Sequence, residues 1–198
     1  MSSEMDFDGG SAPPAEQKPI PAEGLHDAVC YAVVNWGDVL SDFPGSDPEV
    51  HQAVRFFFEL DEKMADGRPF VLSTYPVTIK YGERAKFRTL MKSWLGAKEC
   101  PEKLVGFPLG TMKGRMASLN VEHKLKDDGT FSARIKDVLK ARPGAAPLVI
   151  VNTSLPEWVK QAKEKDNAAA ARFRAHAGQR TADASESDPP YQHDEVPF

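Results

Sequence analysis

The amino-acid sequence predicts a mainly β fold with five or six strands, one internal helix and disordered termini. Short β-prone segments recur between residues 28 and 152, and turn signals separate them. One amphipathic helix interrupts the series, and both ends of the chain are rich in Pro, Ser and acidic residues. Because a parallel α/β fold would alternate strands and helices, we expect a small antiparallel barrel or sandwich instead.

Three extended segments fill the first half of this pattern. Residues 28–36 form a β-prone run that Gly37 closes, and residues 53–60 form a second run, AVRFFFEL. Residues 70–79 form a third segment, which Pro76 interrupts because proline cannot donate to a β ladder. The three adjacent phenylalanines of the second run alternate in direction, so we expect one face in the core and the other at a contact surface.

The predicted helix covers residues 84–95, and Gly96 follows it as a C-cap. Its apolar side chains recur at helical spacing on one stripe, which favours the core for their rings rather than a ligand. The stripe consists of Phe87, Leu90, Met91, Trp94 and Leu95.

Residues 116–123 and 130–138 alternate around Asp128-Gly129, which makes them the clearest predicted hairpin. Residues 148–152, LVIVN, are expected to form a last short strand. A helix between the third and fourth strands is the arrangement with which an OB-fold barrel plugs its open end. The sequence therefore favours an OB-fold-like barrel.

The predicted domain organisation has three parts. Residues 1–22 are expected to form a disordered N-terminal arm, and residues 23–165 the OB-fold-like domain. Residues 166–198 are expected to form a flexible linker and an acidic C-terminal tip, although the Ala-rich run at its start is compatible with a short helix.

The composition indicates a soluble, cytoplasmic protein without a membrane partner. The 198 residues have a mean hydropathy of −0.44, and no apolar run approaches the roughly 18 residues of a membrane span. The acidic start, MSSEMDFDGG, does not read as a signal peptide. Cys30 and Cys100 form no CxxC pair, which favours a reducing compartment over a disulfide scaffold or a zinc module.

Charge is distributed unevenly along the chain. The formal net charge is −4, but residues 80–142 contain 15 Lys or Arg against 7 Asp or Glu. Residues 20–79 and 181–198 are acidic. A basic middle between acidic ends is typical of proteins that bind a polyanion such as a nucleic acid.

Sequence motifs for catalysis and for cofactors are missing. The five histidines show no metal-ligand spacing, and neither GxxxxGK[ST], GxGxxG nor GxSxG occurs, so we expect no catalytic residues, no metal and no cofactor. Glu59, Asp61 and Glu62 offer one alternative, a metal-dependent nuclease. A solvated strand end before a turn explains the same three residues more simply.

Basic residues interleave with aromatic residues through residues 75–136. Cations that follow phosphates and flat rings on which bases stack are what binding to a single strand requires. The predicted phosphate contacts are Lys80, Arg84, Arg88, Lys113, Arg115, Arg134 and Lys136, and the predicted base platforms are Trp36, Tyr75, Tyr81 and Phe131. Phe131 fits the core as well as a platform, and that choice stays open. Arg134 and Lys136 share the strand face that we expect toward the phosphates.

The last residues, Asp194-Glu195-Val196-Pro197-Phe198, resemble the acidic tip of bacterial single-stranded DNA-binding proteins. The resemblance implies recruitment of replication, recombination or repair enzymes through Asp194, Glu195, Val196, Pro197 and Phe198. The terminal ring would enter a pocket, and the acids would steer it to a basic rim. An acidic solubilising tail is the plainer alternative.

The rest of the chain resembles the OB-fold single-stranded DNA-binding proteins of bacteriophages, over roughly residues 24–158. The resemblance rests on Trp36-Gly37, on FFFEL at 56–60, on Asp66-Gly67-Arg68-Pro69 and on the helix end at 93–96. Ser73-Thr74-Tyr75 and LNVEH at 119–123 add to it. The stretch Ile79-Lys80-Tyr81-Gly82 departs from the more polar pattern expected before the helix.

These observations lead to the expectation of a sequence-independent single-stranded DNA-binding protein, not an enzyme. It would protect single strands during phage DNA replication, recombination or repair in the host cytoplasm, as a possible homo-oligomer. An adaptor that binds only proteins is the main alternative, and it predicts no salt-dependent affinity for oligonucleotides.

Overall fold

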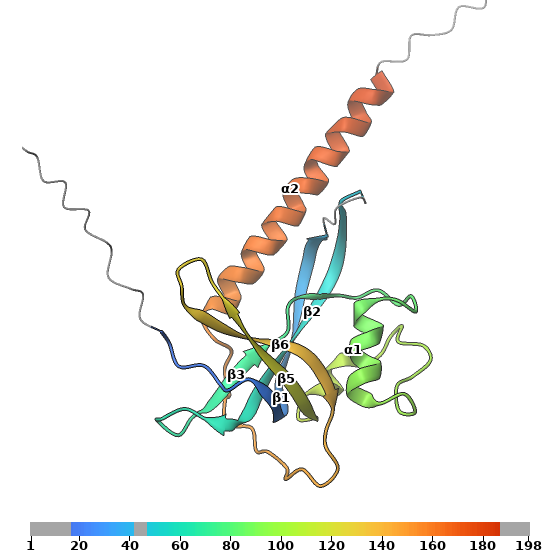
Figure 1. Ribbon diagram of the computed structural model, residues 1–198. Helices are drawn as coiled ribbons and strands as arrows, with labels where there is room; N and C mark the ends of the chain where they lie inside the picture. Colours follow the sequence, from blue (N-terminus) through green and yellow to red (C-terminus); the bar gives the residue numbers. More distant parts are fainter. Residues whose placement is uncertain (1–16, 42–46, 187–198) are drawn as a thin grey trace, which may run out of the picture.

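Six strands form one antiparallel sheet in the computed structural model, which describes residues 17–41 and 47–186 (Figure 1). They are β1 (Gly24–Ser41), β2 (Glu49–Lys63), β3 (Pro69–Ser73), β4 (Val77–Thr78), β5 (Met116–Leu125) and β6 (Phe131–Lys140). The order across the sheet is β3-β2-β1-β5-β6, and β4 pairs with β2. In the described chain the sheet stays open, because no ladder joins β3 to β6. The mainly β prediction is confirmed.

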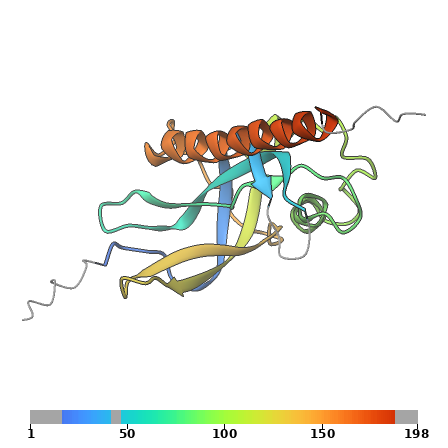
Figure 2. The ribbon, with the colours of Figure 1, turned by 90° about the horizontal axis from the view of Figure 1, so that it is seen from above.

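Two α-helices and one 3₁₀-helix accompany the sheet. They are α1 (Lys86–Leu95), η1 (Leu109–Met112) and α2 (Trp158–Glu186). Figure 2 shows α2 along one side of the molecule and the β5–β6 hairpin on the opposite side, with α1 seen end-on. The helix predicted over 84–95 is confirmed as α1, which ends at Gly96 with a φ of +86°. No described helix is long and apolar enough to cross a bilayer.

Strand β2 is buried on both of its faces. The rings of Phe56 and Phe58 lie 5.4 and 5.2 Å from Trp94 of α1, measured between centroids. Phe57 faces the other way, and its ring lies 6.1 Å from that of Trp158 at the start of α2. All three phenylalanines are fully buried. The expectation that one face of this strand forms a contact surface is therefore wrong, because α2 covers that face.

Polar bonds at Trp36 hold α2 on the sheet. The indole Nε1–H of Trp36 donates to Asp166 Oδ2 at 2.7 Å, and the Asn167 amide donates to the Trp36 carbonyl at 2.9 Å. Asn167 Oδ1 also accepts the N–H of Asp38 at 2.8 Å, and Arg174 pairs with Asp38 further along the helix. Four bonds thus tie α2 to one short stretch of β1.

This docking changes the predicted domain boundary. Residues 166–186, expected in a flexible linker, continue α2, and their first two side chains bind β1. Alanine is the best helix former, so the Ala-rich run extends the helix rather than loosening it. The rest of the linker and the tip, residues 187–198, lie outside the described residues.

The end of the predicted N-terminal arm lies against the body of the protein. The Ala22 N–H donates to the Glu62 carboxylate at 3.0 Å, and a ring nitrogen of His123 lies 2.8 Å from the Pro21 carbonyl oxygen. Gln17 bonds to the backbone of Phe131. Residues 17–22 therefore belong to the folded part, and residues 1–16 lie outside the described residues.

The strand predicted over 148–152 does not form. The backbone N–H groups of Val151 and Asn152 donate instead to the buried carboxylate of Glu59. A side chain thus takes the place of a strand partner, and the apolar run LVIVN is part of the connection between β6 and α2 without regular secondary structure.

Gly37 provides a test of α2 docking. It has a φ of +88°, and a Cβ added there would run into the side chain of Asn167. Gly37→Ala should lower the free energy of unfolding by at least about 1 kcal/mol, measured by urea denaturation, because left-handed strain and the clash add. Gly67→Ala is the matched control, since its φ is +84° and its Cβ would meet nothing within 4 Å. An equal loss in the two variants would contradict the docking of α2.

Candidate nucleic-acid interface

A groove of about 780 Å³ runs between β6 and α2. Its lining comes from the end of β1, from the link between β3 and β4, from one side of α1, from β6 and from α2. The cationic side chains in this lining are Arg84, Lys86 and Lys136, and the side chains with a hydroxyl are Ser41, Thr74, Tyr75, Thr78, Thr89 and Ser93. Two acids, Asp137 and Asp166, also line it. The groove therefore combines positive charge with many hydrogen-bonding groups.

A second pocket of about 410 Å³ adjoins the groove. Tyr75 and Ile135 line both spaces, so the two connect at these residues. Arg55, Ser73, Lys126, Arg134 and Trp158 are among its other lining residues. Groove and pocket together follow the open side of the sheet, between the edges of β3 and β6.

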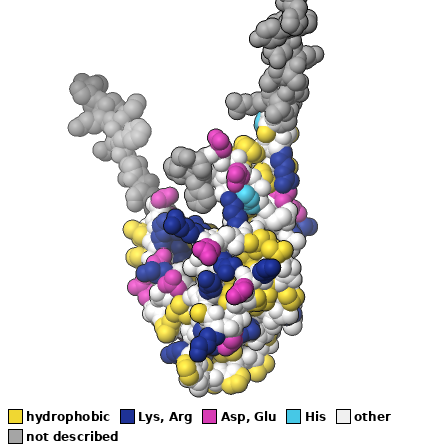
Figure 3. Space-filling model, turned by 90° about the vertical axis from the view of Figure 1, so that its right-hand side faces the viewer, with side chains coloured by type: hydrophobic (Ala, Val, Ile, Leu, Met, Phe, Trp, Pro, Cys, Tyr) yellow, Lys and Arg dark blue, Asp and Glu magenta, His cyan; other side chains and the backbone are white. Residues whose placement is uncertain are grey.

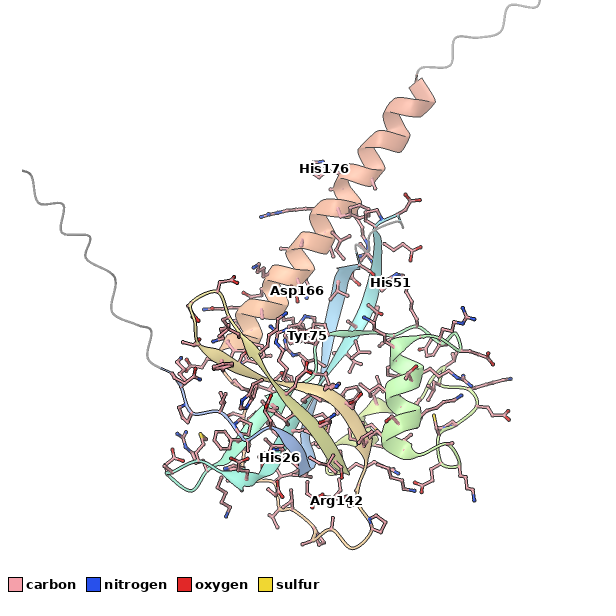
Figure 4. All side chains as sticks on the ribbon, viewed as in Figure 1. His26, His51, Tyr75, Arg142, Asp166 and His176 are labelled. Atoms are coloured by element: carbon pink, nitrogen blue, oxygen red, sulfur yellow. The ribbon has the colours of Figure 1, made fainter. Side chains whose placement is uncertain are left out.

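Tyr75 is the most exposed aromatic ring at this junction. Its exposed fraction is 58%, and the Arg134 guanidinium carbon lies 5.5 Å from the ring centroid. Figure 4 labels Tyr75 at the place where β6 passes the lower end of α2. A flat ring beside a cation at the junction is what base stacking next to a phosphate requires.

The structure gathers part of the predicted set of site residues around the groove and pocket. Tyr75, Arg84, Arg134 and Lys136 all line one space or the other. Tyr75 comes from the link between β3 and β4, Arg84 from the segment just before α1, and Arg134 and Lys136 from β6. The pairing of β6 with β5 shifts register between Ile135 and Asp137, so regular alternation does not extend through Lys136.

The other predicted phosphate contacts lie outside the groove and pocket linings, and Arg88, Arg115 and Lys80 make bonds of their own. Arg88 Nη1 donates to the Glu102 carbonyl at 2.8 Å, and Arg115 pairs with Glu99 at 2.9 Å. Lys80 pairs with Glu49 at 3.3 Å. Lys113 is exposed just before β5 and outside both linings.

Ion pairs also lower the pKa of the acidic partners. The pKa of Glu99 lies below its usual value mainly because its carboxylate accepts a hydrogen bond from Lys140. The charge of Arg115 lowers this pKa further. Arg142 does the same for Asp27. Part of the basic middle of the chain is therefore used in the fold. Figure 3 shows Lys and Arg side chains mixed with acidic and hydrophobic ones on the face seen there.

The predicted aromatic platforms differ in how accessible their rings are. Trp36 is fully buried and bonded to Asp166, so it is not available to a base while α2 is docked, and that prediction is wrong for this conformation. Tyr81 is 40% exposed, and its ring lies 6.3 Å from that of Phe87. Phe131 is 47% exposed, so it is not in the core, and it lies outside both linings.

Arg55 and Trp158 are site residues that the sequence did not reveal. The Arg55 guanidinium carbon lies 4.7 Å from the Trp36 ring centroid and 4.6 Å from that of Trp158, so the cation sits between two indoles. Arg55 Nε donates to Ser73 Oγ at 3.2 Å. Burial lowers the pKa of Arg55, while Asp166 opposes that shift, and the guanidinium stays charged at neutral pH. The only sequence signal was one cation within the apolar run AVRFFFEL.

The three acids of the nuclease alternative point to different partners. Glu59 is buried, and its carboxylate accepts the Val151 and Asn152 amides. Asp61 and Glu62 lie near His26 instead, at 3.7 and 3.5 Å from its ring nitrogen. Within the described residues no group of acids, histidines or cysteines has the arrangement of a metal site.

The comparisons with known proteins leave the chain without an identified family. No protein-family model, curated protein or solved structure matches it. The argument for function therefore rests on the groove, the pocket and the residues that line them.

Glu59 provides a test of its structural role. Glu59→Gln should lower the free energy of unfolding by about 1.5–3 kcal/mol in urea denaturation, because the backbone N–H groups of Val151 and Asn152 lose hydrogen bonds to a buried, charged acceptor. Asp61→Asn is the control and should change it by less than about 0.5 kcal/mol, since that side chain is largely exposed. Cleavage of DNA with Mg²⁺ that disappears in Asp61→Ala would restore the nuclease alternative.

Proposed function

We propose that the protein binds single-stranded DNA, without sequence preference, along the groove and the adjoining pocket. The observation that carries the proposal is the exposed Tyr75 ring at the junction of the two spaces, with Arg134 beside it and Arg84 and Lys136 further along. Cations attract the phosphates, and the ring takes a base of any identity because every base has a π face.

The strand order supports an OB-type barrel that is open between β3 and β6. β1 pairs with β2 and β5, β2 pairs with β3, β5 pairs with β6, and α1 lies in sequence between β4 and β5. OB folds bind oligonucleotides between the loop after the first strand and the loop before the last one. Here the groove begins at Val39–Ser41, next to the first loop, and the pocket includes Lys126 at the second. In an OB-type barrel, the two linings would therefore lie where that fold binds oligonucleotides, which supports the proposal.

The proposal includes the wider role that the sequence predicts. A protein of this kind coats single strands during replication, recombination or repair and recruits enzymes through a C-terminal tip. Residues 194–198 lie outside the described residues, so the recruiting role rests on their sequence alone.

Lys136 and Lys113 form a matched pair for testing the site. Lys136→Ala should weaken binding to oligo-dT and reduce the slope of log affinity against log salt by about 0.7, because one phosphate contact is lost. Lys113→Ala removes the same charge outside the groove and should leave the slope unchanged. The measurement is fluorescence anisotropy of labelled oligo-dT at several salt concentrations, with duplex of equal length beside it.

The same titration decides between the proposal and the adaptor alternative. Tight, salt-weakened binding to the single strand but not to the duplex supports the proposal. Absence of binding at low salt would overturn it and leave the adaptor. Equal effects of Lys136→Ala and Lys113→Ala would move the DNA path away from the groove.

Removal of residues 187–198 tests whether the tip contributes to DNA binding. The deletion keeps all of α2 and takes away three acids, Asp188, Asp194 and Glu195. Affinity for oligo-dT in the same anisotropy assay should be unchanged or tighter, because negative charge near a cationic groove is lost. Substantially weaker binding would place the tip in the DNA site and contradict its role as a partner motif.

A further inference from the structure

The pocket beside the groove has an unusual composition for a surface hollow. Two exposed aromatic rings line it, Tyr75 from the β3–β4 link and Trp158 from the first turn of α2. Two arginines, Arg55 and Arg134, lie against these rings. Its volume of about 410 Å³ falls in the range of roughly 300–1,000 Å³ that is typical of small-molecule sites.

Trp158 is the tryptophan that remains accessible. The chain has three tryptophans, and Trp36 and Trp94 are buried at 0% and 1% exposure, whereas Trp158 is 44% exposed. Both buried indoles also donate their N–H groups, to Asp166 and to the Met116 carbonyl. Trp158 covers Phe57 with part of its ring and leaves 44% of its surface exposed, and a large ring exposed in a pocket is suited to a ligand.

The Trp158 ring is nevertheless held in place. Its centroid lies 4.6 Å from the Arg55 guanidinium and 6.1 Å from the Phe57 ring. The neighbouring Val159 enters the buried cluster under α2, which fixes the start of the helix. A ring that is already ordered loses little entropy when a ligand stacks on it.

We infer that this pocket takes one unstacked nucleobase of the bound strand, with Trp158 and Tyr75 as its stacking rings and Arg55 as the cation behind Trp158. The inference rests on the proposed function and deepens it, since it adds Trp158 as a second stacking ring and assigns the base to the pocket. Phosphate binding by Arg55, Arg134 and Lys126 is the competing occupant, and the two make opposite predictions for a strand that lacks bases.

The test compares two oligomers of equal length, oligo-dT and a strand of stable abasic residues with the same phosphates. Wild-type protein should bind oligo-dT more tightly than the abasic strand, by roughly 5- to 150-fold, which is the gain from stacking one base on one ring. Trp158→Ala should reduce this ratio, and Trp158→Phe should largely restore it. Lys136→Ala should weaken binding to both strands alike and leave the ratio unchanged.

Intrinsic fluorescence supplies a second measurement that does not depend on affinity. Oligo-dT should quench part of the tryptophan emission of the wild-type protein, because a base stacks on the accessible indole. The abasic strand should not quench it. Trp158→Phe should lose the quenching while the two buried tryptophans continue to emit.

Val159→Ala separates the ring from the docking of α2. It removes buried contacts at the same helix turn without changing the pocket lining. The base-to-abasic ratio should therefore stay near the wild-type value. A ratio that falls as far in Val159→Ala as in Trp158→Ala would assign the effect to helix docking and overturn the inference.

The remaining outcomes distinguish the inference from the proposed function. Equal, salt-dependent binding of the two strands by the wild-type protein would overturn the base pocket and base stacking on Tyr75. It would assign the site to phosphate and leave the binding of single-stranded DNA along the groove intact. Absence of binding to both strands at low salt would overturn the proposed function together with the inference.

Discussion

The burial of β2 on both faces is the constraint on which the rest of the structure depends. Phe56 and Phe58 need α1 on one side, and Phe57 needs a cover on the other. A strand with consecutive phenylalanines cannot leave one face to water without exposing a large apolar ring. The chain after β6 must therefore travel back to the far side of the sheet and place α2 there. Glu59, on the same strand, ties down that returning segment.

The groove follows from this two-sided cover. The sheet is open between β3 and β6. Residues of α1, α2 and β6 line the space at this opening, and none of these elements fills it. The β ladder is interrupted there, because the Thr74 hydroxyl accepts the N–H of Phe56 and Pro76 follows two residues later. Tyr75 lies between these two residues and is turned outward. Tyr75, the most exposed ring of the site, is thus exposed because the chain leaves the sheet between β3 and β4.

The electrostatics of the site are more balanced than the charge of the sequence suggested. Several cations of residues 80–142 are paired with acids of the protein itself, as Arg142 is with Asp27 and Arg115 with Glu99. The groove also contains Asp137 and Asp166, which accept hydrogen bonds from Asn120 and Trp36. In the proposed interface these acids oppose phosphate, which suits reversible binding more than permanent attachment.

The sequence by itself determined the elements whose signals are local. The helix stripe ending at Gly96 and the hairpin around Asp128-Gly129 both follow from periodicity and turn chemistry, and the structure contains them. Tertiary structure alone decided how exposed Trp36 and Trp158 are. The docking of α2 buries Trp36 completely and leaves the Trp158 ring partly exposed. It also decided that LVIVN is no strand and that the linker continues as helix. The physical reason is that these outcomes depend on contacts between residues far apart in the chain, such as Asn167 with Trp36, 131 positions away, and no local pattern encodes such a contact.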